Sequence, residues 1–383
     1  MKKIRYGMMG GDLKAFIGEV HRKALNYDTR VEFVSGCFSP DESKNIETGE
    51  AYSLDPKRVY KDYLAMIEGE TNREDKIDFV AITTPNFLHY EMAKAFLEAK
   101  INVVCEKPLS FKIEEAEELE KIAKENDLIF AVMYSYTGYT MVKYAKEMIE
   151  EGMLGKIISV NAEYAQDWLI DQVYAKEQKA GSLSVWRMDP QYSGISNCVG
   201  DIGTHIENMV HYLTGLKIKR LLAVTENFGQ ALELDAKIIV EYDNGVKGSY
   251  WSSQIASGRM NGLLVRIYGE KGSIEWEQHF PDYIKYTPKN SPTQTLSKGM
   301  GYLSLKSAKY GRIPSGHPEG YYIAFANVYK NIITTLLKRK NNEPLTKEDL
   351  DFPTVTDGLN GVKFVHAVIE SSNNNSKWVT IIK

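Results

Sequence analysis

The first third of the chain alternates between short β-rich apolar runs and longer stretches with helical periodicity. Strands buried on both faces are predicted at 3–9, 31–38, 77–82, 101–105 and 128–133. Helices are predicted between some of them, at 88–99 and 111–126, where apolar residues recur with helical spacing. Strand followed by helix, repeated, predicts an α/β fold with a doubly wound parallel sheet.

The pattern changes after about residue 135. Residues 158–164 alternate apolar and polar side chains, which predicts a strand with one solvated face. Two hairpins are predicted, at Asp243-Asn244-Gly245 and at Gly269-Glu270-Lys271-Gly272. Residues 289–318 show little periodicity and indicate a long excursion or a mobile loop, and helices return at 319–338 and 357–370. We therefore expect a doubly wound domain over residues 1–135, and an α+β domain with an open, mainly antiparallel sheet over residues 136–383.

Composition excludes several classes of protein. A chain of 383 residues exceeds the size of one hydrophobic core, and a net charge of -4 supplies no field that favours nucleic acid. Its three cysteines have no paired spacing, so neither a disulfide framework nor a metal site is expected. No signal region and no apolar run of about 18 residues is visible. We expect a cytoplasmic protein that does not enter a membrane.

A glycine-rich turn follows the first predicted strand and precedes a helix. It runs from Gly7 to Gly18 and includes Gly10, Gly11, Phe16 and Ile17. Glycines at such a turn let the backbone approach a dinucleotide pyrophosphate, which the helix N-terminus stabilises. The spacing is irregular, because about seven residues separate Gly10 from Gly18, more than in the plain G-x-G-x-x-G motif. A bland strand-to-helix loop would also explain these glycines.

The residues after the second strand bear on the choice between NAD and NADP. An acidic residue about twenty positions after the last glycine normally bonds the adenosine ribose, but this chain has Phe38 and Ser39 there. Without a carboxylate, a 2′-phosphate is not repelled, and Ser39 and Lys44 could hydrogen-bond it. This favours NADP over NAD. The alternative is that Phe38 stacks on adenine and both cofactors are accepted.

Two polar segments lie at the carboxyl ends of the next strands, where open α/β sheets bind ligands. Thr84-Pro85-Asn86 ends the strand at 77–82, and Asn86 and His89 could contact ribose or nicotinamide. Alternatively, Asn86 is a helix cap. Glu106-Lys107-Pro108 ends the strand at 101–105, and a lysine there favours a cleft over a plain surface position.

A third polar segment, Asp201-Ile202-Gly203-Thr204-His205, leads into a predicted helix. If the helix starts at Asp201, the i and i+4 spacing places Asp201 and His205 on one face, close enough to address one substrate. The alternatives are an ordinary helix cap at Asp201 and a structural histidine at 205.

In combination these segments resemble the glucose-fructose oxidoreductase, inositol dehydrogenase and rhizopine catabolism family. Glu106-Lys107-Pro108 matches its E-K-P, Asp201-x-Gly203-x-His205 its D-x-G-x-H, and Thr84-Pro85-Asn86-x-x-His89 its T-P-N-x-x-H. The resemblance implies an N-terminal Rossmann domain and a C-terminal domain whose large sheet often forms the oligomer interface, hence a homodimer or homotetramer. It also implies that Lys107 and His205 carry the chemistry with help from Asp201, that Glu106 lies at the cofactor, and that the Lys107–Pro108 peptide is cis.

Two further segments resemble a subgroup of the family and suit a sugar. Their candidate substrate contacts are Gln166, Asp167, Trp168, Trp186 and Arg187, with a tryptophan stacking on a ring face and polar groups reaching hydroxyls. The alternative is that both tryptophans are core residues. The glycine turn is longer than in typical members, and Phe38 replaces the acidic residue that many members carry.

The reaction implied is reversible oxidation of a secondary ring hydroxyl of a sugar or cyclitol to a ketone. His205 would be the base, because the ordinary pKa of histidine lies near working pH, and Lys107 would orient the hydroxyl and stabilise negative charge. Asp201 would bond a neighbouring hydroxyl or orient His205. Two alternatives stay open: a glycosidase or epimerase that retains its cofactor through transient hydride transfer, and a non-catalytic sugar or cofactor sensor.

Overall fold

The computed structural model describes residues 3–174 and 185–381, with side chains described for residues 3–174 and 187–381. Residue contacts divide the chain into two compact units. The first contains residues 1–138 and 321–359, and the second contains residues 139–320 and 360–383.

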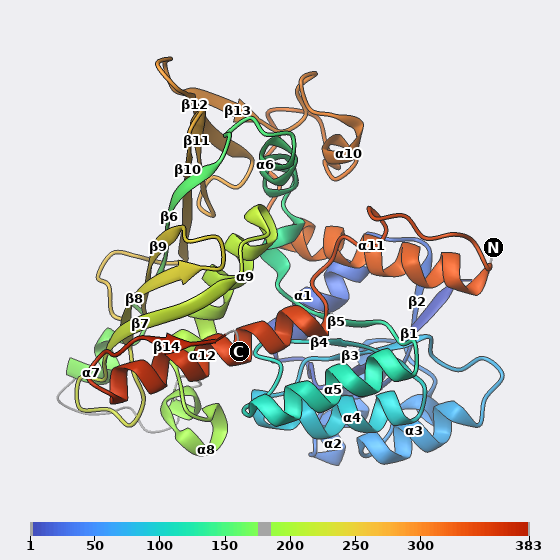
Figure 1. Cartoon of the computed structure of the whole chain (residues 1–383). Coiled ribbons are helices and arrows are strands. Elements are labelled where there is room, and N and C mark those ends of the chain that lie inside the picture. Colours follow the sequence, from blue (N-terminus) through green and yellow to red (C-terminus); the bar gives the residue numbers. More distant parts are fainter. Residues whose placement is uncertain (1–2, 175–184, 382–383) are drawn as a thin grey trace. The chain divides into compact units, whose positions relative to one another are not determined.

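The first unit is built on a five-stranded parallel sheet with the order β2-β1-β3-β4-β5 (Figure 1). Its strands are β1 (Ile4–Met9), β2 (Val31–Cys37), β3 (Phe79–Ile82), β4 (Asn102–Cys105) and β5 (Phe130–Val132). Every residue of β1 except Arg5 is buried, as expected for an interior strand of a covered sheet. The chain leaves β1 toward β2 and returns on its other side as β3, so the strand order reverses beside β1 and the predicted doubly wound sheet is confirmed.

Helices cover both faces of this sheet (Figure 1). One face carries α1 (Phe16–Leu25) and α11 (Tyr321–Lys340), and the other carries α3 (Tyr63–Thr71), α4 (His89–Glu98) and α5 (Ile113–Glu125). Between β2 and α3 lies α2 (Glu42–Ala51). The helices predicted at 88–99 and 111–126 correspond to α4 and α5.

The core of the first unit includes a helix from the last fifth of the chain. Phe325, Tyr329, Ile332 and Ile333 of α11 are buried in one cluster with residues of α1 and β1. Burying such a side chain contributes about 1.5–3 kcal/mol, which explains why α11 belongs to this unit. The sequence pattern groups residues 136–383 together, because hydrophobic periodicity finds a helix without showing which sheet it covers. The functional division of the chain at residue 135 stays a prediction.

The second unit contains a nine-stranded sheet with the order β13-β12-β11-β10-β6-β9-β8-β7-β14 (Figure 1). Its strands are β6 (Ile157–Ala165), β7 (Ile218–Glu226), β8 (Asp235–Tyr242), β9 (Lys247–Ser253), β10 (Gly262–Gly269), β11 (Gly272–Glu277), β12 (Tyr283–Pro288), β13 (Gln294–Ser297) and β14 (Val379–Thr380). All pairings are antiparallel except that of β6 with β9. Both predicted hairpins are present, between β8 and β9 and between β10 and β11.

Helices of this unit pack on one face of the sheet or join its strands. They are α6 (Thr140–Glu150), α7 (Ile170–Tyr174), α8 (Pro190–Ser193), α9 (Thr204–Thr214) and α10 (Leu305–Ala308). The predicted final helix is α12 (Val355–Asn373), whose residues from 360 onward belong to this unit.

The excursion at 289–318 is anchored rather than loose. Lys298 is buried and its Nζ lies 3.7 Å from Oε1 of Glu319, and the same Oε1 accepts hydrogen bonds from the backbone amides of Arg312 (2.6 Å) and Ile313 (2.8 Å). A buried lysine is tolerated when its charge is paired. These contacts hold the middle and the end of the segment on the buried carboxylate of Glu319, which favours the long excursion over the mobile loop.

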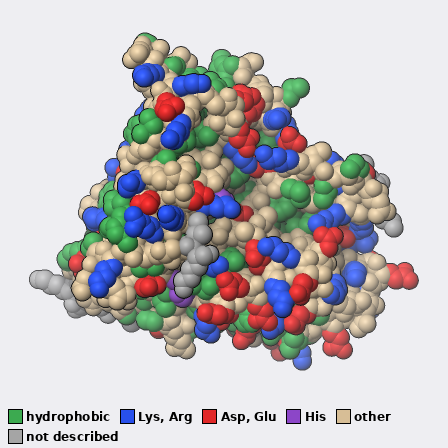
Figure 2. All heavy atoms as spheres, in the orientation of Figure 1, with side chains coloured by type: hydrophobic (Ala, Val, Ile, Leu, Met, Phe, Trp, Pro, Cys, Tyr) green, Lys and Arg blue, Asp and Glu red, His purple; other side chains and the backbone are tan. Residues whose placement is uncertain are grey.

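Charges of both signs are interspersed on the face of the molecule drawn in Figure 2. Ion pairs near the surface of the protein include Lys124 with Glu120 at 2.8 Å and Lys285 with Glu275 at 2.7 Å. Exposed pairs of this kind contribute little to stability, at most about 1 kcal/mol each. Within the described residues, no helix is long and apolar enough to cross a membrane.

Candidate active site

The glycine-rich turn joins β1 to α1 through a close backbone contact. Gly10 and Gly11 have φ of 76° and 80°, a region that favours glycine. A Cβ on Gly18 would lie 2.3 Å from the Cα of Gly11, so only glycine lets α1 start this close to the turn. The N-cap residue Ala15 makes no side-chain cap to α1. The first amides of α1 are thus left for another acceptor, and this arrangement fits a dinucleotide pyrophosphate.

Two other predicted cofactor residues, Phe16 and Ile17, are the first two residues of α1. Phe16 is 67% exposed, and its ring stacks on that of Tyr321 with centroids 6.5 Å apart. Ile17 is partly buried against the core.

Phe38, which is predicted to contact the cofactor, is buried in the core of the first unit. Its ring is 4% exposed and packs edge-on against Phe33 and Tyr52, so it offers no open face on which adenine could stack. The expectation rested on the position of Phe38 after β2, but its apolar side chain joins the core instead.

The start of α2 carries charge that the strand end lacks. Asp41 is the N-cap of α2 and accepts a hydrogen bond from the amide of Lys44. The Lys44 ammonium lies 3.8 Å from Asp41 Oδ2, and Ser39 Oγ accepts a hydrogen bond from the Asp41 amide at 3.2 Å. Ser39 and Lys44, the two groups predicted to hold a 2′-phosphate, are therefore both engaged with Asp41.

The T-P-N-x-x-H segment follows β3, with Pro85 exposed and Asn86 at the first residue of a short 3-10 turn. Thr84 Oγ1 is buried and has no hydrogen-bond partner among the described residues. Such a group needs a partner, so Thr84 fits a contact with a bound molecule.

His89 contacts two backbone carbonyls, and its contact with ribose or nicotinamide stays a prediction. Its ring is fully buried, with Nδ1 2.8 Å from the Pro108 carbonyl oxygen and Nε2 3.0 Å from that of Thr84. His89 thus connects the loops that follow β3 and β4. Burial lowers the pKa of His89 from its ordinary value, and the two carbonyl contacts act against that shift.

The Glu106-Lys107-Pro108 segment follows β4, and the Lys107–Pro108 peptide is cis, as the resemblance implies. Lys107 is half-buried. Glu106 is 7% exposed and lies in a hydrogen-bonded cluster: its Oε1 is 2.8 Å from Nε2 of His21, and its Oε2 accepts a hydrogen bond from the Lys107 amide at 3.2 Å. Through these contacts Glu106 fixes the backbone of Lys107.

His21 has a role in this cluster that no sequence motif indicated. It is fully buried in α1, and its Nδ1 lies 2.6 Å from the hydroxyl of Tyr329. A carboxylate accepts, so Nε2 carries the proton toward Glu106, and Nδ1 is hydrogen-bonded to the Tyr329 hydroxyl. Burial raises the pKa of Tyr329, which keeps its hydroxyl a donor.

In the second unit, Asp201 lies in a π-helical turn, Val199–Gly203, that continues into α9. The i to i+4 geometry predicted for Asp201 and His205 assumed an α-helix from Asp201, which the wider π turn alters. Turns of this type are frequent at functional sites. His205 is 7% exposed, and its ring lies 5.9 Å from that of Tyr164.

The carboxylate of Asp201 meets two polar side chains. Its Oδ2 accepts a hydrogen bond from Gln254 Nε2 at 2.9 Å and lies 3.9 Å from Arg187 Nε. The guanidinium of Arg187 also lies 5.8 Å from the centre of the Trp168 ring, which is 37% exposed. The predicted substrate residues Asp201, Arg187 and Trp168 are thus brought together.

Gln166 joins the same group. It accepts a hydrogen bond from Trp168 Nε1 at 2.8 Å and donates one to Asn261 Oδ1 at 2.7 Å. Tyr164, beside His205, donates to the same Asn261 oxygen at 3.3 Å. Sequence reasoning missed Asn261 and Gln254, which belong to no motif; the nearest signal was the position of Gln254 directly after β9.

One predicted substrate residue, Asp167, makes its contact elsewhere. Asp167 accepts a hydrogen bond from the Gly258 amide at 2.9 Å and so holds the loop after β9. The side chain of Trp186 lies outside the described residues.

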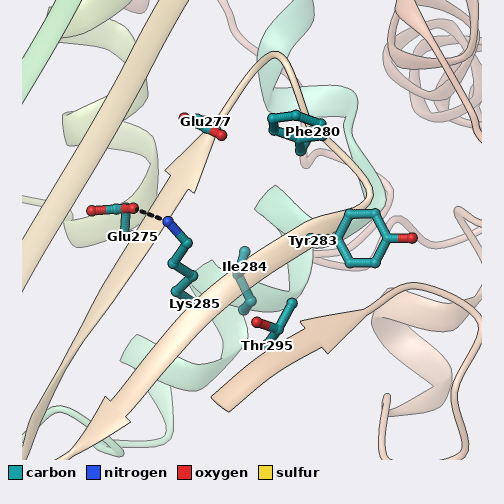
Figure 3. A pocket seen from close by; sticks show the side chains of 7 residues that line it. All are labelled: Glu275, Glu277, Phe280, Tyr283, Ile284, Lys285 and Thr295. Carbon is teal, nitrogen blue, oxygen red and sulfur yellow. Dashed lines mark hydrogen bonds and ion pairs between the residues drawn. The ribbon is translucent and has the colours of Figure 1, made fainter. Parts of the chain in front are cut away.

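A separate pocket lies on strands β11 to β13, and its lining contains none of the predicted site residues (Figure 3). It has a volume of about 290 Å³, and its lining includes Phe280, Tyr283 and the Glu275–Lys285 ion pair. Among residues 3–174 and 187–381, no group of three or more His, Cys, Asp or Glu side chains could hold a metal ion.

Comparisons with known proteins agree with these features. Residues 4–134 match the oxidoreductase family with an NAD-binding Rossmann fold, and residues 142–275 match the GFO/IDH/MocA C-terminal domain. An uncharacterized oxidoreductase of Bacillus subtilis, YfiI, is 33% identical and covers 99% of this chain and 97% of its own. An oxidoreductase structure from Sinorhizobium meliloti is 39% identical, with a TM-score of 0.88 and coverage of 99% and 100%.

An inositol dehydrogenase homolog from Azotobacter vinelandii has been solved with NAD+ and with NADH and myo-inositol. It is 33% identical, and the two structures have TM-scores of 0.92 and 0.90, covering 99% of this chain and 97% or 98% of theirs. The chain belongs to the Gfo/Idh/MocA family of oxidoreductases and has its NAD-binding Rossmann domain.

Proposed function

We propose that this protein is an NAD-dependent dehydrogenase that oxidises a secondary ring hydroxyl of a sugar or cyclitol to a ketone. The observation that carries the proposal is the hydrogen-bonded cluster of Asp201, Gln166, Trp168 and Arg187 beside His205. Amide, carboxylate and guanidinium groups around an aromatic ring suit a polyhydroxylated ring.

Relatives support the substrate class. The Azotobacter vinelandii homolog binds myo-inositol, and a levoglucosan dehydrogenase of Pseudarthrobacter phenanthrenivorans is 31% identical over 55% of this chain. Myo-inositol is a cyclitol and levoglucosan is an anhydrosugar. The proposed substrate class therefore includes both cyclitols and sugars.

The chain's own residues have separate roles in the proposed reaction. His205 accepts the hydroxyl proton as general base, because a histidine exchanges protons near neutral pH. Lys107 orients the hydroxyl and stabilises the negative charge that develops on its oxygen. Asp201 bonds a neighbouring hydroxyl. The nicotinamide, when bound, takes the hydride from the carbinol carbon.

The cofactor is held by groups of the first unit. Gly10, Gly11 and the uncapped start of α1 receive the pyrophosphate, with Phe16 and Ile17 beside it, and Thr84, Pro85 and Asn86 line the loop after β3. Glu106 serves indirectly by fixing the Lys107 backbone. This assigns cofactor binding to residues 1–135, and substrate binding and oligomer formation to residues 136–383.

We propose NAD as the preferred cofactor, in place of the NADP that the strand end alone favours. Asp41 and Glu42 are both exposed at the start of α2, and the ammonium of Lys44 lies beside Asp41. A 2′-phosphate there would meet more negative than positive charge. The homolog solved with NAD+ and NADH supports this choice.

We also propose that the protein is a homodimer or homotetramer that uses the large sheet. Alternate residues on β8 and β9 leave Ile239 and Trp251 partly exposed on the face away from the buried Ile238 and Tyr250. Light scattering of the purified protein tests this: a dimer or tetramer mass is expected, and a monomer at micromolar concentration would reject it.

The dehydrogenase assignment is tested by a turnover screen with NAD against inositols, anhydrosugars, hexoses and sugar phosphates. Lys107→Met and His205→Ala should each remove most turnover while NAD binding, measured by calorimetry, survives. The exposed residues Lys121 and His317, changed in the same way, serve as matched controls. Near-normal rates in either site variant would reject the assigned role.

A further inference from the structure

Gln254 connects Asp201 to polar groups that lie deeper in the second unit. It follows β9 directly and is fully buried. Its Nε2 donates to Asp201 Oδ2 at 2.9 Å and to Gln166 Oε1 at 3.4 Å, while its Oε1 accepts from Asn197 Nδ2 at 2.8 Å. One side chain thus contacts two predicted substrate residues.

These contacts fix which way the amide of Gln254 points. Both partners of Nε2 are oxygen acceptors, and the partner of Oε1 is an NH₂ donor. Rotating the amide by half a turn would place its oxygen against a carboxylate and its NH₂ against another NH₂, which loses all three hydrogen bonds. Hydrogen-bond donation therefore runs in one direction: Asn197 donates to Gln254, and Gln254 donates to Asp201.

The residues at the far end of this chain of contacts are also held. Glu233 is buried and accepts hydrogen bonds from Ser196 Oγ (2.6 Å), the Asn197 amide (3.2 Å) and the Val199 amide (2.9 Å). These bonds fix Asn197 and the start of the π turn that carries Asp201. Two backbone hydrogen bonds hold Gln254 as well. Its amide donates to the Leu234 carbonyl, and its carbonyl accepts from the Leu169 amide.

We infer that Gln254 is a positioning residue whose amide, oriented by Asn197, holds the Asp201 carboxylate and the Gln166 carbonyl in the arrangement that meets the substrate. The inference rests on the proposed dehydrogenase function. Gln254 touches neither reacting atoms nor cofactor in this assignment, so its effect reaches the reaction through Asp201.

The test compares two variants that alter the polarity of these contacts with one that does not. Gln254→Glu keeps shape but places a second carboxylate against Asp201. Asn197→Asp replaces the donor to Gln254 with an acceptor, so the Gln254 amide should turn and present its oxygen to Asp201. Ser252→Ala is the control, because Ser252 is a buried residue of β9 that bonds Cys198 and not Asp201.

With the substrate found by the screen, both variants should lose about 10- to 100-fold in kcat/KM at neutral pH while NAD affinity is unchanged. The loss in Gln254→Glu should shrink as pH falls, because the introduced carboxyl group, once protonated, again donates to Asp201. A purely structural role would not produce this pH dependence. Wild-type kcat/KM with an unchanged pH profile in folded Gln254→Glu would overturn the inference.

Two further measurements keep the inference separate from the proposed function. If the wild type turns over no substrate, the dehydrogenase proposal fails, and crystal structures then decide the positioning role alone. A changed Asp201 orientation in Gln254→Glu supports it, and an unchanged one overturns it. If Gln254→Glu does not fold, the orientation of Asp201 is compared between wild type and Asn197→Asp, because Asn197 contacts Gln254 and leaves both Gln254 and Asp201 unchanged in sequence.

Discussion

His21 and Glu106 form a buried hydrogen bond, with Nε2 of His21 2.8 Å from Oε1 of Glu106. The same imidazole meets Tyr329 at 2.6 Å, and the other oxygen of Glu106 accepts from the Lys107 amide. Three distant segments of the first unit, α1, the end of β4 and α11, therefore converge on one carboxylate. Glu106 is thus hydrogen-bonded to the Lys107 backbone on one side and to His21, which also meets Tyr329, on the other.

Tyr329→Phe tests this cluster. The change removes the hydroxyl and leaves the buried Nδ1 of His21 without its partner, so the free energy of unfolding should fall by about 1–3 kcal/mol. Urea denaturation measures it. Tyr322→Phe is the matched control, because Tyr322 is half-buried and keeps its ring under Lys23; it should change stability by at most about 0.5 kcal/mol. Equal effects of the two changes would contradict the role of the cluster.

Gly18→Ala tests the fit of the glycine turn. The added methyl would lie 2.3 Å from the Gly11 Cα, so α1 must move away from the turn. We expect a loss of about 1–3 kcal/mol in stability and a clear weakening of NAD binding, measured by fluorescence titration. Gly301→Ala, where nothing lies within 4 Å, should leave both unchanged. Wild-type NAD affinity in folded Gly18→Ala would show that the close approach is not needed.

His89 predicts a pH dependence of stability. Burial lowers the pKa of His89 in the folded protein. At a pH near the ordinary histidine pKa of about 6.5, the unfolded chain therefore binds more protons than the folded protein. Stability from this group is therefore present above that pH and is lost as pH falls through the folded pKa, with a slope of at most about 1.4 kcal/mol per pH unit. Urea unfolding from neutral to mildly acidic pH should show a shallower slope in His89→Gln than in wild type.

The exposed His317, changed to Gln, is the control for this measurement and should leave the slope as it is in wild type. A wild-type slope in His89→Gln would mean that His89 does not set the acid sensitivity.

Asp41→Asn tests the cofactor preference. Asparagine caps helices as well as aspartate does, so α2 is kept while one negative charge is removed. We expect wild type to bind NAD more tightly than NADP, and the ratio of the two dissociation constants to narrow in Asp41→Asn. Asp62→Asn, the same change at the N-cap of α3, is the matched control. A wild type that prefers NADP would reject the proposal that Asp41 and Glu42 disfavour the 2′-phosphate.

Local patterns were enough to predict most elements of the fold. Strands β1 to β5, both hairpins and helices α4, α5, α11 and α12 follow from periodicity and turn residues, because these signals lie within a few positions of one another. The assignment of α11 to the first unit could not follow, since it depends on packing between residues such as His21 and Tyr329, which are 308 positions apart.

The candidate site was predictable only in part, for the same reason. Motifs identified Lys107, Asp201 and His205 as candidates, but the residues around them are ordinary amides far along the chain, such as Gln254, which contacts Asp201, and Asn261, which contacts Gln166. Position near a strand end does not report burial: Phe38 directly follows β2 and His89 begins α4, yet both side chains are buried. Burial is a tertiary property that sequence position alone does not report.

The proposed dehydrogenase reaction is tested most directly by comparing the amount of NADH formed with the amount of ketone formed. Wild-type protein, excess NAD and the substrate found by the screen are mixed, and NADH is followed by absorbance while ketone is quantified by mass spectrometry. A dehydrogenase with His205 as its base should form equimolar NADH and ketone, and His205→Ala should form neither. Consumption of substrate without net NADH would contradict it and indicate a reaction that retains its cofactor.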